Sequence, residues 1–360
     1  MAVVVGTRPE IIKMAPVIFE LEKRGIDYIF IHTGQHYDYE LSTQFISELG
    51  LPKPDYFLKL NYNDPPAYIS EIMIGLWGIF RTSDPDIVLV EGDTNSVVAS
   101  ALTALKMNIK IGHVEAGLRS FDWRMPEEHN RIIVDHISDV LFAPTEGAKN
   151  NLVIENIHGK IFVTGNTIID SVILYMPVAE KQSKIMEHIK FKEYALMTVH
   201  RAENVDNTQV LRNFINLCLK SPIPIVFPIH PRTFKRLKES GLDRALTNSP
   251  NVQLFPPLGY FDFLMLMKNC KLILTDSGGL QEEATAPPIR KPVIVLRLST
   301  ERPEAVEAGF ARVVGVNCED ILKSVYDVLK GKFIPASKSP FGNGKASKKI
   351  VDIVSDNILR

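Results

Sequence analysis

The strongest constraint on the fold is a regular alternation of short β-branched runs with longer segments of helical periodicity. The amphipathic segments include Glu10–Arg24 and Ser96–Lys106. The predicted strands are Val3–Val5, Tyr28–His32, Ile87–Val90, Lys110–His113, Val140–Ala143 and Ile161–Thr164, then Tyr194–Val199, Ile223–Phe227, Val252–Leu254, Leu272–Thr275, Val293–Leu296 and Arg312–Val314. This rhythm predicts an α/β protein in which helices cover both faces of parallel sheets.

The chain length predicts two domains, because 360 residues exceed the roughly 150 of a typical domain. The alternation restarts near residue 194, so we predict two doubly wound domains. They span 1–168 and 169–347, and a C-terminal helix, 348–360, packs back on the first. Polar motifs follow the strands of both halves. Since ligands of open α/β sheets bind beyond the carboxyl ends of the strands, we expect an active site in one interdomain cleft.

Composition excludes several other classes of protein. Lys and Arg total 41 against 42 Asp and Glu, a formal charge of −1, which argues against a nucleic-acid binder. The three cysteines form no CxxC pair, so we expect buried, reduced thiols in a cytoplasmic protein rather than zinc ligands or disulfides. No apolar run approaches the roughly 20 residues that span a bilayer, so no membrane partner is expected.

The turn after the first predicted strand has the features of an anion site. Thr7 and Glu10 have capping-box spacing, and Gly6 relaxes the turn into the helix. Arg8 can donate two parallel hydrogen bonds to a diphosphate, and Lys13 lies one helical turn further on. The alternative is a capped helix whose arginine is merely solvated.

A second candidate anion site is the segment Asp276–Glu283. Ser277 adds a hydroxyl donor, and the adjacent Gly278 and Gly279 allow a phosphate to approach backbone N–H groups. Glu283 can accept hydrogen bonds from ribose hydroxyls. The alternative is an ordinary glycine turn. The chain contains neither a GxxxxGK[ST] motif nor a GxGxxG motif after its first strand, so the usual P-loop and dinucleotide fingerprints are absent.

Three carboxylates in the first half are candidates for acid/base catalysis. Asp93 and Glu115 each follow a predicted strand, and Glu127 follows Pro126. Asp93 could instead cap a helix, and Glu127 could form an i,i+4 surface pair with Arg131. Glu115 is harder to explain structurally, because it interrupts a stretch of apolar and small residues.

Two histidines end predicted strands in the second half. His200 and His230 can each donate to a phosphate or act as a general acid, although either can also be a structural histidine. His32 and His36, which flank Gly34 and Gln35, are less informative, and no histidine spacing in the chain suggests a metal, so we predict no metal site.

The ordered set of motifs resembles the non-hydrolysing UDP-N-acetylglucosamine 2-epimerases from Val3 to at least Gly309. The motifs are GTRPEIIKMAP (Gly6–Pro16), EGDT (Glu91–Thr94), HVEAGLRS (His113–Ser120), PEEHNR (Pro126–Arg131), TVHRAEN (Thr198–Asn204), IHPR (Ile229–Arg232), DSGGLQEEA (Asp276–Ala284) and TERPEA (Thr300–Ala305). The resemblance implies two Rossmann-like domains in a GT-B-like arrangement. It also implies a homodimer.

The resemblance implies reversible conversion of UDP-GlcNAc to UDP-ManNAc, a precursor for polysaccharide biosynthesis. UDP is eliminated to leave enzyme-bound 2-acetamidoglucal and is then added back, so no hydride cofactor is needed. By motif match, Arg8, Lys13, His200 and Arg302 hold the diphosphate, Ser277, Gly278 and Gly279 bind it through hydroxyl and backbone donors, Glu283 binds the ribose, and Phe263 lies by the uracil. Asp93, Glu115 and Glu127 are the acid/base candidates, with Arg131 orienting Glu127.

Three alternatives remain open at this level. A hydrolysing 2-epimerase releases UDP and free ManNAc, but such enzymes usually lack the Arg8–Lys13 stretch. A GT-B glycosyltransferase uses the same nucleotide cleft but needs an acceptor site, for which the sequence has no signal. A non-catalytic nucleotide-sugar sensor needs none of the three carboxylates that are present here.

Overall fold

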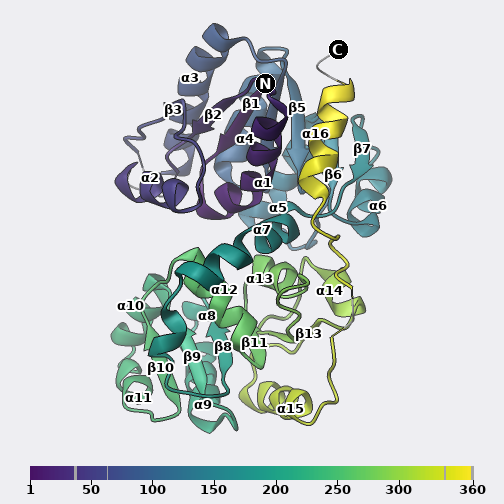
Figure 1. The fold of residues 1–360 in the computed structure, drawn as a ribbon. Coiled ribbons are helices and arrows are strands. Elements are labelled where there is room, and N and C mark those ends of the chain that lie inside the picture. The colour runs from purple at the N-terminus through teal and green to yellow at the C-terminus, as the bar shows by residue number, and fades with distance from the viewer. Residues whose placement is uncertain (36–38, 63, 336–337, 358–360) are drawn as a thin grey trace. The chain divides into compact units, whose positions relative to one another are not determined.

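The computed structural model describes residues 1–35, 39–62, 64–335 and 338–357, which form two α/β units (Figure 1). The first unit comprises Met1–Ser171 and Phe341–Arg360, and the second comprises Val172–Pro340. Each unit is built on its own parallel sheet. The prediction of two doubly wound α/β sheets is therefore confirmed.

Seven strands of the described residues form the first sheet, in the order β3-β2-β1-β4-β5-β6-β7. Their bounds are β1 Ala2–Val5, β2 Ile29–His32, β3 Tyr56–Phe57, β4 Ile87–Glu91, β5 Lys110–Val114, β6 Val140–Ala143 and β7 Lys160–Val163. Ala2 of β1 pairs in parallel with Ile29 on one side and with Val88 on the other. The chain order therefore reverses between β1 and β4, which is where such sheets open to ligands.

Six strands within the described segments form the second sheet, in the order β10-β9-β8-β11-β12-β13. Their bounds are β8 Ala195–Thr198, β9 Ile225–Pro228, β10 Val252–Phe255, β11 Leu272–Thr275, β12 Val293–Val295 and β13 Ala311–Val313. Here the chain order reverses between β8 and β11. The two sheets thus repeat one topology.

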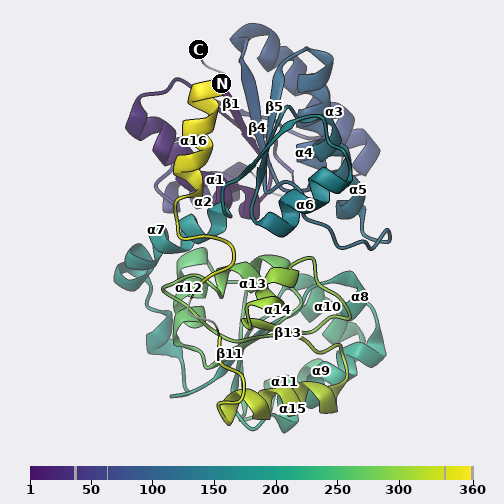
Figure 2. The ribbon, with the colours of Figure 1, turned by 90° about the vertical axis from the view of Figure 1, so that its right-hand side faces the viewer.

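Helices cover both faces of each sheet, as Figure 2 shows for β1, β4 and β5, which run between α1 and α16 on one side and α3 and α4 on the other. In the first unit the helices are α1 Arg8–Arg24, α2 Tyr39–Glu48, α3 Pro65–Ser83, α4 Asn95–Lys106, α5 Pro126–Ile137, α6 Glu146–Ile154 and α16 Ala346–Asn357. The second unit has η1 Ile185–His188, α8 Ala202–Val205, α9 Thr208–Lys220, α10 Pro231–Glu239, α11 Asp243–Thr247, α12 Tyr260–Asn269, α13 Gly278–Glu283, α14 Pro303–Glu307 and α15 Cys318–Leu329. Helix α7, Thr167–Gln182, passes from the first unit to the second.

Every strand expected from the sequence is present, and the described residues contain one strand that was not expected. The missed strand, β3, contains only Tyr56 and Phe57 and lies at the sheet edge, where its side chains are partly exposed. A two-residue edge strand buries too little apolar surface to leave a pattern in the sequence. Strand β1, by contrast, was predicted correctly because all four of its residues are apolar and fully or almost fully buried.

The C-terminal helix α16 lies beside α1 in the first unit (Figure 1). Asp170 of α7 accepts hydrogen bonds from the backbone N–H groups of Ala346 and Ser347, at 3.2 and 2.9 Å, and so caps the start of α16. Arg24 of α1 forms an ion pair with Asp352, at 2.6 Å. The predicted helix is thus described as far as Asn357, and residues 358–360 lie outside the described residues.

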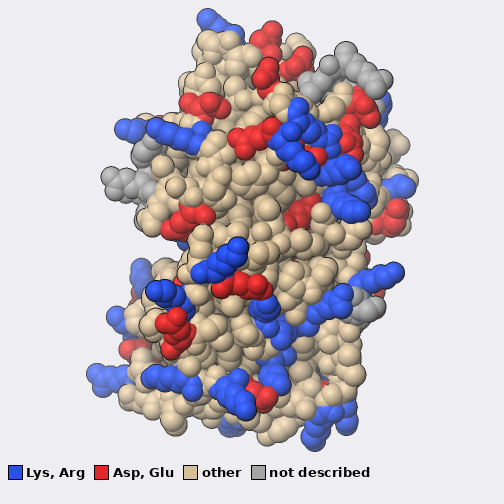
Figure 3. All heavy atoms as spheres, in the orientation of Figure 1, with Lys and Arg blue, Asp and Glu red and all other residues tan. Residues whose placement is uncertain are grey.

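The surface agrees with the near-neutral charge. Figure 3 shows acidic and basic side chains interspersed on the face that it presents, without a broad field of one sign. The three cysteines are buried and unpaired. Among the described residues, no helix is both long enough and apolar enough to cross a membrane.

Candidate functional site

The turn between β1 and α1 is closely packed. A Cβ on Gly6 would lie within 3.0 Å of both the Ser96 and the Thr33 hydroxyl oxygens, so only glycine fits. The buried Glu10 accepts hydrogen bonds from the Gly6 N–H at 2.6 Å and from the Thr7 hydroxyl at 2.9 Å. Burial raises the pKa of Glu10 to about 7, although these hydrogen bonds oppose the rise. Glu10 therefore holds the predicted anion turn in shape.

Arg8 is the first residue of α1 and is half-buried beside α2. Its guanidinium carbon lies 5.0 Å from the centre of the Phe45 ring, a cation–π contact. This stacking restricts where the Arg8 guanidinium can lie. Arg8 is thus placed at the carboxyl end of β1, where the sequence predicts an anion site.

Lys13 lies one turn further along α1, between two buried carboxylates. Its ammonium nitrogen is 2.9 Å from Glu91 Oε1, at the end of β4, and 2.5 Å from Glu115 Oε2, just after β5. Asn166 donates from its amide nitrogen to the same Glu115 oxygen, at 2.7 Å. The sequence associated Lys13 with a diphosphate, but in this structure its charge is directed to the two carboxylates.

Glu115 has a backbone conformation that is unusual for its residue type. Its φ is +68°, in the left-handed region that side chains other than glycine seldom adopt. Such strain costs on the order of 1 kcal/mol or more and persists where the surroundings fix it, often at functional sites. The strained backbone and its buried, ion-paired carboxylate mark Glu115 as a candidate catalytic group.

Asp93 and Glu127 lie on the loop after β4 and in the first turn of α5. Arg131 donates to Asp93 Oδ2 at 2.5 Å and to Glu128 Oε2 at 2.6 Å, and the Asn130 amide donates to the Asp93 carbonyl at 2.9 Å. Glu127 is half-buried and has no hydrogen bond or ion pair to any described residue. The sequence pairs Arg131 with Glu127, whereas these two bonds of Arg131 connect Asp93 to Glu128.

A buried network supports the loops that carry Asp93 and Glu115. The ring of His113, in β5, bonds through Nε2 to the Gly92 carbonyl at 2.8 Å and through Nδ1 to Asp135 at 2.7 Å. Arg119 donates to Asp135 at 2.7 Å and to Glu155 at 2.6 Å. Although burial opposes it, His113 and Arg119 lower the pKa of Asp135. The network therefore holds in place the loop that carries Asp93 and the loop that carries Glu115.

In the second unit, Asp276 organises the carboxyl ends of β8 and β11. This fully buried carboxylate accepts from the backbone N–H groups of His200 and Arg201 at 3.0 Å and from the Asn204 amide at 3.0 Å. The His200 ring nitrogen Nδ1 lies 3.3 Å from Asp276 Oδ1. Asp276 thereby orients the His200 ring, which is 35% exposed in its side chain and can meet a ligand.

The two predicted histidines lie together, with ring centres 5.6 Å apart. Burial lowers the pKa of His200; Asp276 opposes this, and Arg201 and His230 act with burial. His230 caps α10, because its Nδ1 accepts the Arg232 N–H at 3.2 Å. Burial, aided by Arg232, also lowers the pKa of His230. With Nδ1 accepting, the neutral His230 ring carries its proton on Nε2 and can donate from there.

Arg302 and Glu301 belong to a buried set of charges in the second unit. Arg302 pairs with Glu282 at 2.6 Å, and Glu301 pairs with Arg297 at 2.7 Å and Arg201 at 3.4 Å. Although burial opposes it, Arg302, Arg297 and Arg201 lower the pKa of Glu301 to about 2. Arg297 also lies 3.5 Å from Glu203, so three arginines and three carboxylates form one set of ion pairs here.

After Asp276, Ser277 is the N-cap of α13, and Gly278 and Gly279 are the first residues of that helix. Ser277 and Gly279 are half-buried, whereas Gly278 is buried, and a Cβ on Gly278 would lie within 3.0 Å of a Glu301 carboxylate oxygen. Gly279 has no such neighbour. Glu283, later in α13, is 9% exposed, and Phe263 is half-buried in the neighbouring α12. Four of these five predicted residues thus belong to α12 or α13 of the second unit, and Ser277 directly precedes α13.

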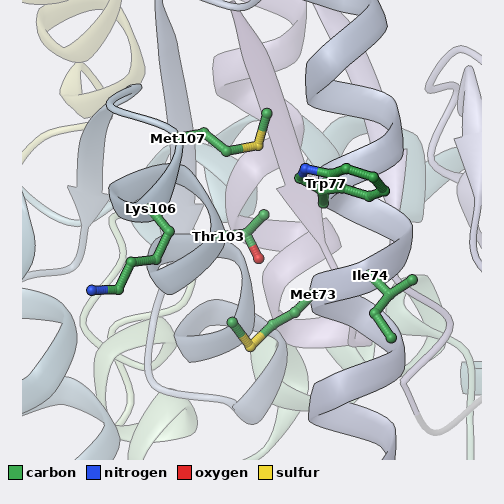
Figure 4. Close-up of a pocket in the computed structure, with 6 residues that line it drawn as sticks. All are labelled: Met73, Ile74, Trp77, Thr103, Lys106 and Met107. Carbon is green, nitrogen blue, oxygen red and sulfur yellow. The ribbon is translucent and has the colours of Figure 1, made fainter.

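One pocket lies away from the predicted site residues. The pocket has a volume of about 360 Å³ and is lined by residues of α3 and of α4 and its C-cap (Figure 4). Trp77 and Ile74 are 50% and 68% exposed. The pocket lining is Met73, Ile74, Trp77, Thr103, Lys106 and Met107. Without a carboxylate or histidine in its wall, it is not a candidate catalytic site. Within the described segments, no cluster of three or more His, Cys, Asp or Glu is placed to hold a metal ion.

Sequence reasoning missed several residues that position the predicted ones. Glu91 had a readable signal, because a charged residue that closes an all-apolar strand needs a buried partner. Asp276 had a similar signal, because it is a charged residue that directly follows the fully buried strand β11. Asn166 had none, because its contact with Glu115 depends on where the chain returns 51 residues later.

Comparison with known proteins identifies the family. The family model for UDP-N-acetylglucosamine 2-epimerase matches residues 20–355. The chain is 46% identical to the UDP-N-acetylglucosamine 2-epimerase of Methanocaldococcus jannaschii, covering 99% of this chain and 98% of that one. It is 36% identical, over 98% of both chains, to the UDP-2,3-diacetamido-2,3-dideoxy-D-glucuronate 2-epimerase of Pseudomonas aeruginosa.

Solved structures agree with these sequence matches. The Methanocaldococcus jannaschii UDP-GlcNAc 2-epimerase in complex with UDP-GlcNAc and UDP superposes with a TM-score of 0.90, at 46% identity and 99% coverage of both chains. The Neisseria meningitidis enzyme bound to UDP-GlcNAc gives a TM-score of 0.89, at 36% identity and the same coverage. With the motifs, the two doubly wound sheets and these full-length matches in agreement, the chain belongs to the UDP-N-acetylglucosamine 2-epimerase family.

Proposed function

We propose that this protein interconverts UDP-GlcNAc and UDP-ManNAc without net hydrolysis. The observation that carries this proposal is the group of carboxylates in the first unit, Asp93, Glu115 and Glu127, placed on the loops that follow β4 and β5 and at the start of α5. Inverting a carbon centre requires proton removal and delivery on opposite faces, and therefore more than one acid/base group.

The chemistry explains why carboxylates and cations are both needed. The C2 proton of the sugar has no adjacent carbonyl to make it acidic. We propose that a carboxylate removes this proton while the C1–O bond to UDP breaks and a C1–C2 double bond forms. Protonation of C2 from the other face and return of UDP to C1 complete the inversion. Because electrons are neither gained nor lost overall, the reaction needs no redox cofactor, and we propose none.

In the first unit, we assign the acid/base steps to Asp93, Glu115 and Glu127. Glu127 is half-buried and unpaired among the described residues, so a sugar can contact it directly. Arg131 holds Asp93. We assign Arg8 to the diphosphate, and we propose that Lys13 controls the charge of Glu115.

In the second unit, we propose that UDP is bound. Its cations and hydrogen-bond donors are suited to a leaving diphosphate, because preorganised donors stabilise the charge that develops as the C1–O bond breaks. The residues assigned to the diphosphate are His200, His230, Ser277, Gly278, Gly279 and Arg302. We assign Glu283 to the ribose and Phe263 to the uracil.

The test is incubation with UDP-GlcNAc in D2O, followed by NMR. We expect UDP-ManNAc that carries deuterium at C2. Free ManNAc together with UDP as the main products would instead establish a hydrolysing 2-epimerase. Tight UDP binding without turnover or exchange would leave a nucleotide-sugar sensor.

A second candidate substrate is a UDP-linked 2,3-diacetamido uronate. The observation that favours it is the Pseudomonas aeruginosa relative, 36% identical over 98% of both chains, which bears that substrate in its name. The same D2O experiment with both nucleotide sugars separates the two candidates, and the substrate with the higher kcat/KM is the better one.

We also propose that the protein is a homodimer. The apolar side chains Ile74 and Trp77 are 68% and 50% exposed beside the pocket in Figure 4, and interfaces commonly bury such side chains. Light scattering coupled to gel filtration tests this. We expect a dimer for the wild type and a monomer after Trp77→Glu; a wild-type monomer would contradict the proposal.

A further inference from the structure

Glu91 is a charged residue in a place that normally excludes charge. It closes β4 after four buried apolar residues, and only 1% of its surface is exposed. An ionised carboxylate in such a position is costly unless it is paired. Sequence reasoning gave it no role, and the acid/base set proposed above does not include it.

Lys13 is the partner of Glu91, and it is shared with Glu115. The ammonium lies 2.9 Å from Glu91 and 2.5 Å from Glu115, and the exposed fractions of the three side chains are 9% or less. Asn166 adds a neutral donor to Glu115. Glu10, on α1, is a further acidic group that acts on Glu91. The buried carboxylates of Glu91 and Glu115 therefore share the single positive charge of Lys13. The Glu10 carboxylate adds to the repulsion that acts on Glu91.

Two carboxylates that share one cation in a buried site do not both ionise readily, and their protons are exchanged as a pair. Burial, reinforced by Glu115 and Glu10 and opposed by Lys13, raises the pKa of Glu91 well above its ordinary value. The set of Lys13, Glu91 and Glu115 is called here the buried triad. Its two carboxyl groups therefore retain one proton at pH values at which solvent-exposed carboxyl groups have lost theirs.

We propose that Glu91 is a positioning residue that shares Lys13 with Glu115 and thereby keeps one proton of the buried triad available to Glu115 during epimerisation. Before Glu115 delivers a proton to C2, Lys13 passes a proton to Glu115 and receives one from Glu91, so the single carboxyl proton of the triad moves from Glu91 to Glu115 and Glu91 is left ionised. When Glu115 removes a proton from C2, the transfers run in reverse. Glu91 contacts no substrate atom in this scheme. The inference rests on the proposed epimerase function.

The test compares Glu91→Gln with wild type and with Glu20→Gln, a control on α1 whose carboxylate pairs with Arg24 away from the triad. The rate of C2 deuterium exchange is measured as a function of pH. In Glu91→Gln, Glu115 is the one carboxylate of the triad that still pairs with Lys13. The Glu115 carboxyl therefore ionises more easily than in wild type. We expect the limb of the profile that depends on Glu115 to move to lower pH by about one unit. KM is expected to stay unchanged, and the control to match wild type.

An unshifted profile in Glu91→Gln, or a loss by one constant factor at every pH, would overturn the inference and leave Glu91 as a structural residue. If Glu91→Gln does not fold, Glu91→Asp replaces it. Its carboxylate is one methylene further from Lys13, so a smaller shift in the same direction is expected, and an unshifted profile again overturns the inference.

A second readout separates this inference from the proposed function. A carboxyl whose pKa is raised in the folded state makes the protein less stable as the pH rises through that pKa. The thermal midpoint of wild type is therefore expected to fall with rising pH more steeply than that of Glu91→Gln. Equal slopes would contradict the shared proton. Absence of exchange in the wild type, by contrast, would reject the epimerase function whatever the slopes.

Discussion

The two adjacent glycines of α13 make a sharp prediction, because a methyl group added at each meets a different environment. On Gly278 the new Cβ would lie within 3.0 Å of Glu301 Oε1, closer than Cβ atoms come in real structures. On Gly279 the nearest atom outside its own helical backbone is Glu283 Oε1, at 4.0 Å. We therefore expect Gly278→Ala to lower the stability of the protein and Gly279→Ala to leave it unchanged.

The size of the effect follows from how firmly Glu301 is held. Its carboxylate is buried and is paired with Arg297 at 2.7 Å and Arg201 at 3.4 Å, so it cannot swing freely away from a Gly278 methyl group. Overpacking of this kind costs about 1–3 kcal/mol. Each kcal/mol lowers Tm by roughly 2–4 °C in a domain of this size. Gly279→Ala keeps its stability, because alanine is favoured over glycine inside a helix.

The assay is thermal unfolding without ligand, combined with UDP titration by calorimetry. We expect Gly278→Ala to lower Tm. Gly279→Ala is expected to retain Tm but to bind UDP more weakly, because its methyl group occupies the approach to the backbone N–H groups. A wild-type Tm for Gly278→Ala would refute the packing argument. Wild-type UDP affinity in Gly279→Ala would remove this backbone from the nucleotide site.

Three further predictions concern buried carboxylates. Glu301→Gln is expected to flatten the loss of stability as pH falls from 4.5 toward 2, worth roughly 3 kcal/mol in wild type because the folded pKa is lowered; unfolding free energies measured across this range test it. Glu10→Gln should act with the opposite sign. Since the folded pKa is raised from 4.5 to about 7, wild type loses roughly 3 kcal/mol as pH rises through this interval, and the variant should not; equal slopes would show that Glu10 does not titrate there. Glu115→Gln is expected to abolish C2 deuterium exchange while UDP binding persists, and wild-type exchange would remove Glu115 from the catalytic set.

The strand pattern could be predicted because it is a local property. Each inner strand is buried on both faces and therefore consists of consecutive apolar residues, which are visible without knowledge of the fold. The same reasoning placed Arg8, Asp93 and His200 directly after strands. It failed for β3, which is too short and too exposed to leave such a pattern.

The contacts between charged groups could not be predicted, because they depend on distant parts of the chain. Arg131 and Glu127 have the spacing of a helical pair, yet the contacts of Arg131 that join the loop after β4 to α5 go to Asp93 and Glu128. His200 and Asp276 are 76 residues apart and meet because β8 and β11 are neighbours in the sheet. A strand order that reverses in the middle of a sheet creates such neighbours, and no local pattern reports it.

By itself, the sequence determined the alternation of strands and helices, the division into two doubly wound sheets and the motifs that mark the family. These follow from apolar periodicity and from short runs of adjacent residues. Only the tertiary structure decided how the charges are shared. Lys13 and Glu115 are separated by 102 residues, and Glu91 joins them from a third element. Electrostatic energy depends on distance through space and on burial, and both are set only once the strands have packed.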